Sequence, residues 1–175
     1  IYLSGISWIS NSLTFDQNFK ILIPFALILL PLLLSLFNAT IILIIGPYLK
    51  LNFSFFFLFS ASLSVIDYLR SKILTGFPWN LWAYSTSWAN EILQIVNLIG
   101  LHSYNLLVIT FFTLPIVFYF QISSVKKILV FLATFATLLT LFIYGNFEIN
   151  KNIKFLNQSN EKIYVKVISP NFELR

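Results

Sequence analysis

The sequence predicts an all-α polytopic membrane bundle of about four spans plus an interfacial helix, followed by the first β-strand of a truncated α/β domain. Of the 175 residues, 58% are hydrophobic and 10% are charged, and the mean hydropathy is +0.86. Soluble domains carry about 25% charged residues. A bilayer core needs about 20 apolar residues of helix to cross it, and several charge-free stretches reach or approach that length.

The apolar stretches divide into four expected spans and one shorter helix. Within the first span, Pro24 falls in the first turn, where its missing N–H costs little, whereas Pro31 is expected to kink the helix. Ser60 and Ser64 of the second span form a small-residue face on which another helix can approach closely. The pattern changes at Gly100, which divides the long third stretch. The spans are expected at about 21–46, 51–70, 101–120 and 127–145, with the interfacial helix at about 91–99.

The composition shifts after Gly145. Residues 146–162 are rich in Asn, Lys and Gln and predict a linker that leaves a membrane domain formed by residues 1–145. The alternation from Lys162 to Ile168 predicts a strand, so residues 163–175 are expected to open a further domain that is cut short. The chain contains no methionine and begins with Ile1, so we expect it to be an internal segment.

Charge and residue usage exclude several functions. The net charge of +5 comes from 11 basic residues that form no patch, so nucleic-acid binding is not supported. The absence of cysteine excludes disulfides, thiolate metal sites and a cysteine nucleophile. His102 is the one histidine, with no acidic cluster beside it, and favours a structural role over metal binding. We therefore expect no metal, no cofactor and no catalytic residue in this chain.

The chemistry concentrates between Asp67 and Trp88. Its aromatic residues are typical of a belt at the headgroup level, or of a rim that grips acyl chains, with Pro78 fixing a turn. Asp67 and Arg70 are three residues apart and share a helix face. They predict either an interfacial ion pair or, for Arg70 or Lys72, contact with a phospholipid phosphate, which suits a guanidinium.

This run, with Leu-Thr-Gly-Phe-Pro-Trp at 74–79, resembles the loop between two spans of bacterial apolipoprotein N-acyltransferases. Two other stretches are similar to the same family and occur in its order. They are Gly5–Leu13 with the following Ile-Pro-Phe-Ala-Leu at 23–27, and Val165–Asn171, which is similar to the strand that opens the family's nitrilase-like domain. Ser169 stands where glutamine is usual in that strand.

The resemblance implies an inner-membrane enzyme with about eight spans and a periplasmic nitrilase-like αββα domain. Such enzymes transfer an acyl chain from a phospholipid, through a catalytic cysteine, to the amino group of a diacylglyceryl-cysteine apolipoprotein. Their Glu–Lys–Cys triad cannot be carried over to any position here, so the chain alone is expected to be inactive. The expected partners are the phospholipid donor, the apolipoprotein acceptor and membrane lipid. The residues expected to bind substrate are Arg70, Phe77, Pro78, Trp79 and Trp82.

Orientation and two rival functions stay open. Counting Lys and Arg would place the tryptophan-rich loop in the cytoplasm, whereas the resemblance places it, and the C-terminal tail, in the periplasm. A polytopic transporter usually shows ionisable residues at the bilayer midplane, and here the charges lie at the ends of the spans. A non-catalytic membrane anchor is the second alternative.

Overall fold

The computed structural model describes residues 2–48, 53–73 and 80–158, and every element in these ranges is helical. The elements, in chain order, are α1 (Tyr2–Ile6), the 3-10 helices η1 (Ser7–Thr14) and η2 (Gln17–Leu22), α2 (Ile23–Ile45), η3 (Gly46–Tyr48), α3 (Phe53–Ile73), η4 (Trp82–Thr86), α4 (Asn90–Leu93), α5 (Val96–Ile99), α6 (Leu101–Thr113), η5 (Leu114–Tyr119) and α7 (Ser124–Gln158).

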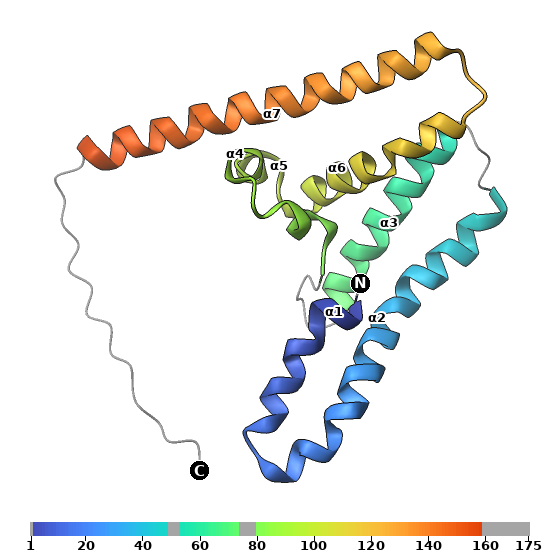
Figure 1. The fold of residues 1–175 in the computed structure, drawn as a ribbon, viewed down its shortest axis with the longest axis vertical. Helices are drawn as coiled ribbons and strands as arrows, with labels where there is room; N and C mark the ends of the chain where they lie inside the picture. Colours follow the sequence, from blue (N-terminus) through green and yellow to red (C-terminus); the bar gives the residue numbers. More distant parts are fainter. Residues whose placement is uncertain (1, 49–52, 74–79, 159–175) are drawn as a thin grey trace.

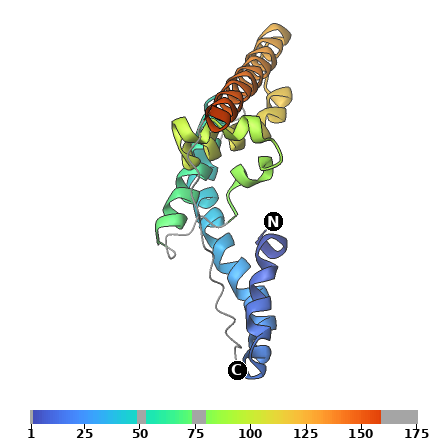
Figure 2. The same ribbon diagram turned by 90° about the vertical axis from the view of Figure 1, so that its left-hand side faces the viewer.

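The helices form an open arrangement around a central pair (Figure 1). α3 packs against α6 in the middle, α2 packs against the other side of α3, and α1 lies beside α2. α7 runs across the opposite end, where α4 packs against it, and the view turned by 90° shows the same separation of α7 from the α1–α2 pair (Figure 2). The α3–α6 pair therefore joins the two outer parts.

The α3–α6 contact confirms at Ser60 the close helix approach expected on the second predicted span. Ser60 is 1% exposed, and its Oγ lies 3.1 Å from Oγ1 of Thr113 on α6. Small polar side chains allow two helix backbones to approach closely and supply a hydrogen bond between them. The apolar core lies on both sides of this contact, in one cluster around Tyr104 and Val108 and another around Val117 and Phe120.

Three helical stretches among the described residues are long and apolar enough to cross a membrane: Gln17–Tyr48, Leu101–Tyr119 and Ser124–Asn157. They correspond to the first, third and fourth predicted spans. The second, at 51–70, does form a helix, α3, but it is not among these three, so its crossing of the bilayer stays a prediction. Its serines and its ionised residues make α3 less apolar than the others.

Two predicted helices are divided in the structure. The interfacial helix expected at 91–99 is two short helices, α4 and α5, separated by a turn that carries Ile95 into the core. The third span stays α-helical only to Thr113 and continues as the 3-10 helix η5. Pro115 explains this change, because a proline has no N–H to donate and its ring clashes with the carbonyl of residue 111 in an α-helix. By contrast, α2 continues through Pro31, and Pro24 lies in its first turn as expected.

The residues expected to form a linker are helical as far as Gln158. They belong to α7, which has 35 residues from Ser124 to Gln158 and continues past Gly145. A segment rich in Asn, Lys and Gln is polar, but polarity alone does not predict a linker, because Lys and Gln are also good helix formers. Gly145 does not end the helix. It lies where α4 packs against α7, and a Cβ at this position would collide with the backbone carbonyl of Glu91. The strand expected from residue 162, and the domain expected at 163–175, lie outside the described residues.

Candidate functional site: a buried polar network beneath the aromatic segment

Asp67 and Arg70 form an ion pair on the last turns of α3. Nη2 of Arg70 donates to Oδ1 of Asp67 over 3.0 Å, and each residue is 1% exposed. The expected pairing is confirmed, and the pair is buried inside the protein. Nε and Nη1 of Arg70 have no hydrogen-bond partner among the described residues, and the guanidinium lies 5.2 Å from the centre of the Tyr2 ring. At this burial, the packing of the described residues does not offer Arg70 to a lipid phosphate.

Asn105 of α6 connects this pair to the aromatic segment. Its Nδ2 donates to Oδ2 of Asp67 over 3.1 Å, and its Oδ1 accepts from the backbone N–H of Ala83 over 2.9 Å. Asn105 is 1% exposed and Ala83 is 2% exposed, so both bonds are shielded from solvent. A single amide therefore connects the end of α3, the first turns of α6 and the 3-10 helix η4.

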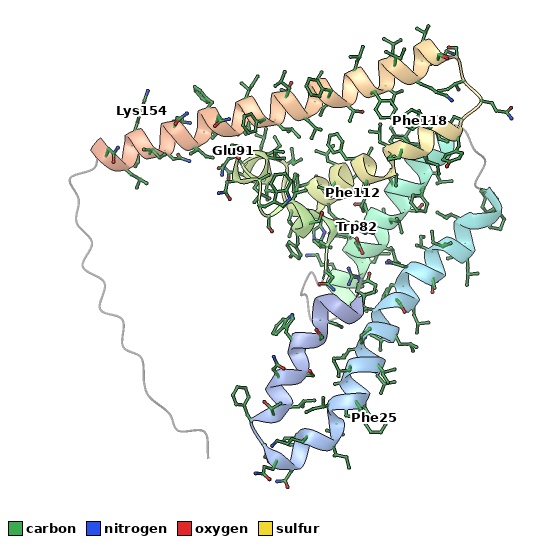
Figure 3. The ribbon with its side chains drawn as sticks, in the orientation of Figure 1. Phe25, Trp82, Glu91, Phe112, Phe118 and Lys154 are labelled. Atoms are coloured by element: carbon green, nitrogen blue, oxygen red, sulfur yellow. The ribbon has the colours of Figure 1, made fainter. Side chains whose placement is uncertain are left out.

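A second contact holds η4 on α6. The Thr86 hydroxyl donates to the carbonyl of Ala83 over 2.7 Å, so the proton in its 2.6 Å contact with the Tyr104 hydroxyl comes from Tyr104. The half-buried ring of Trp82 lies 6.0 Å from the ring of Phe112, and the two side chains are labelled in Figure 3. Hydrogen bonds and ring packing thus give η4 a defined position on α6.

Two cavities border η4, and the first has the larger share of polar lining. The first, of about 410 Å³, is lined by residues that include Tyr2, Asn38, Asn80 and Trp82. Asn38 donates to the Tyr2 hydroxyl over 2.9 Å, whereas Oδ1 of Asn38 and Nδ2 of Asn80 have no partner among the described residues. The second cavity, of about 460 Å³, is an apolar groove between α6 and α7 that begins at Thr86.

The structure describes only part of the predicted substrate-binding set. Arg70 and Trp82 belong to one assembly, the first beneath η4 and the second in it. Phe77, Pro78 and Trp79 lie outside the described residues, so their contacts stay a prediction. Among the described residues, no three of His, Cys, Asp and Glu are grouped as metal ligands would be.

Sequence reasoning missed Asn105 and Tyr104, the residues that join the network to η4. The available signal was an amide in the first turns of an apolar helix, where an unpaired polar group is costly and therefore indicates a buried partner. His102 lies one turn before Asn105 on α6. Its Nε2 is 3.4 Å from Oγ of Ser71, and its ring packs edge-on against the Tyr68 ring.

These features define a helical membrane protein whose aromatic segment is held at one end of its central helices by a buried polar network. The family model described as the apolipoprotein N-acyltransferase N-terminal domain matches residues 1–114. The chain belongs to the apolipoprotein N-acyltransferase family. No solved structure matches it.

Curated relatives in two bacterial genera carry the same name. The apolipoprotein N-acyltransferase of Rickettsia bellii is 30% identical over 152 residues, which cover 86% of this chain and 30% of the relative. That of Brucella suis is 32% identical over 123 residues, which cover 65% of this chain and 22% of the relative. The chain therefore corresponds to less than a third of the length of these relatives.

Proposed function

We propose that this chain is the membrane portion of an acyltransferase that moves an acyl chain from a phospholipid to the N-terminal amine of a diacylglyceryl-cysteine apolipoprotein. The observation that carries the proposal is the family match over residues 1–114, together with relatives named for this activity. The protein would lie in the bacterial inner membrane with residues 159–175 on the periplasmic side.

The chemistry would be divided between this chain and a nitrilase-like domain. The family resemblance implies a cysteine that is activated by a neighbouring base and forms a covalent acyl intermediate. This chain has no cysteine and so supplies no such nucleophile. Its proposed task is to hold a lipid path at the bilayer surface, with Phe77, Pro78, Trp79 and Trp82 at the rim.

Arg70 takes a positioning role in this proposal. Because it is 1% exposed and bonded to Asp67, it acts through that carboxylate and Asn105 on the backbone of η4. This differs from direct contact with a headgroup. A buried ion pair in a membrane helix also suits the rival transporter function. However, the bonds of this pair lead to η4 at one end of α3 and α6, which favours a structural support for a surface segment.

The test is an acyl-transfer assay. The full-length protein is reconstituted in vesicles that contain phosphatidylethanolamine and is given a synthetic diacylglyceryl-cysteine peptide. Mass spectrometry should detect the peptide gaining one acyl group. Trp82→Ala removes the ring that packs against Phe112, so the rim loses its position and the rate should fall about tenfold or more. Trp8→Ala is the matched control, because Trp8 is 62% exposed on η1 and should leave the rate unchanged.

The two failures have different meanings. A wild-type protein that folds in the vesicles but transfers no acyl group would refute the proposed activity. A Trp82→Ala variant with the wild-type rate would leave the activity standing and remove η4 from the lipid path.

A further inference from the structure

The polar side chains that line the groove between α6 and α7 have no free donor left for a ligand. Four lining residues carry a polar side-chain atom, and each is already bonded to the protein. Thr86 and Tyr104 bond to each other, Nε1 of Trp88 donates to the carbonyl of Ser85 over 3.1 Å, and Thr134 donates to the carbonyl of Val130 over 2.8 Å. A water molecule or a peptide carbonyl in this groove would therefore find no side-chain donor among these four residues, which disfavours a polar occupant.

The rest of the lining is apolar and comes from both helices. Val108 is buried at 3% exposure at the floor, Phe112 is 56% exposed at the side, and Leu138 and Leu141 face them from α7. Apolar surface of this extent, open between two membrane-length helices, suits a hydrocarbon occupant.

The length of the groove matches one leaflet. Its α6 wall runs from Tyr104 to Pro115, which corresponds to roughly 16 Å along the helix axis. Half of a bilayer core is about 15 Å. α7 runs antiparallel beside it, because Leu141 packs in the cluster of Tyr104 whereas Phe131 packs with Leu114 at the other end.

The two ends of the groove differ in polarity, as do the ester end and the methyl end of a lipid acyl chain. Trp88, Thr86 and Tyr104 lie at the end next to η4, and Trp and Tyr are the residues enriched at membrane interfaces. Phe131, Leu114 and Pro115 form the far end. A lipid chain inserted from the interface would therefore have its ester end beside η4 and its methyl end at Phe131.

We propose that the groove between α6 and α7 binds one acyl chain of a membrane phospholipid, with the ester end held beside Thr86 and Trp88. The inference deepens the proposed function and rests on it for the identity of the lipid as donor. The first cavity, whose lining includes Asn38 and Asn80, borders the same 3-10 helix η4.

The test is photo-crosslinking of a lipid to the full-length protein. The protein is reconstituted in vesicles that contain a phospholipid with a diazirine in the middle of one acyl chain. Peptide mass spectrometry should find the label concentrated on the groove residues Val108, Phe112 and Leu141. Leu138→Trp fills the groove and should reduce this labelling about tenfold. Leu139→Trp is the matched control, because Leu139 is 49% exposed on the next position of α7, does not line the groove and should leave the labelling unchanged.

Two outcomes would overturn the inference. One is wild-type label spread evenly over the outward-facing residues of α6 and α7, with no preference for the groove, a result that needs no variant to fold. The other is displacement of the label by a diacylglyceryl-cysteine peptide at lower concentration than by unlabelled phospholipid, which would assign the groove to the acceptor. Acyl transfer is measured separately, so loss of the proposed activity would not be mistaken for loss of the groove.

Discussion

Replacing Asn105 by alanine tests whether the buried amide network holds the aromatic segment. The substitution removes two hydrogen bonds, of 3.1 Å to Asp67 and 2.9 Å from the Ala83 N–H, and both partners are almost fully buried. Leaving a buried polar group unsatisfied costs about 1–3 kcal/mol, and more when the group is charged. Two such groups predict a loss of about 4 kcal/mol in the free energy of unfolding. This corresponds to roughly a thousandfold change in the unfolding equilibrium.

The measurement is the unfolding transition in mixed micelles, followed by circular dichroism as the denaturing detergent is increased. Asn97→Ala is the matched control, because Asn97 is exposed on α5 and its replacement should change the free energy by less than about 0.5 kcal/mol. Asn105→Asp keeps an acceptor for Ala83 and places a second carboxylate against Asp67, so it should destabilise at least as much as the alanine variant. An Asn105→Ala protein that unfolds like the wild type would refute the clamping role of the network.

Two further substitutions probe how the helices approach one another. Gly145→Ala places a Cβ against the carbonyl of Glu91 and should lower the free energy of unfolding by about 1–3 kcal/mol, because α4 is pushed away from α7. Gly46→Ala is the control, because its added Cβ has nothing within 4 Å and should not destabilise the protein. Equal effects of the two substitutions would contradict the close approach of α4 and α7. Ser60→Leu overfills the α3–α6 contact and should cost a similar amount in the same unfolding assay. Ala61→Leu, on the exposed side of α3, is its control, and a neutral Ser60→Leu would show that the two helices are not tightly packed.

The positions of the main helices could be predicted, because hydrocarbon solvent imposes a length and a composition that are visible in the sequence. The helix approach through Ser60 was predictable for a similar reason, since serine is small and able to bond across helices. The Asp67–Arg70 pair was also accessible, because both residues lie one turn apart on one helix.

What could not be predicted depends on residues distant in sequence. Asn105 and Asp67 are separated by 38 positions, and no periodicity indicates that one will bond to the other. The local sequence around Gly145 predicts the end of a helix, whereas the structure places its backbone against Glu91 of α4. The proline at 115 indicates a change of helix type, but the length of the apolar stretch alone predicts one continuous helix.

Because α7 is one continuous helix, it fixes the direction of the chain at its C-terminal end. A helix of 35 residues is roughly 50 Å long, against a hydrocarbon thickness of about 30 Å. A flexible tether would absorb one inserted residue between Gly145 and Gln158 without effect. A rigid helix converts it into a rotation of about 100° and an advance of about 1.5 Å. The direction in which the chain points at residue 158 is therefore set by the exact count of residues in α7.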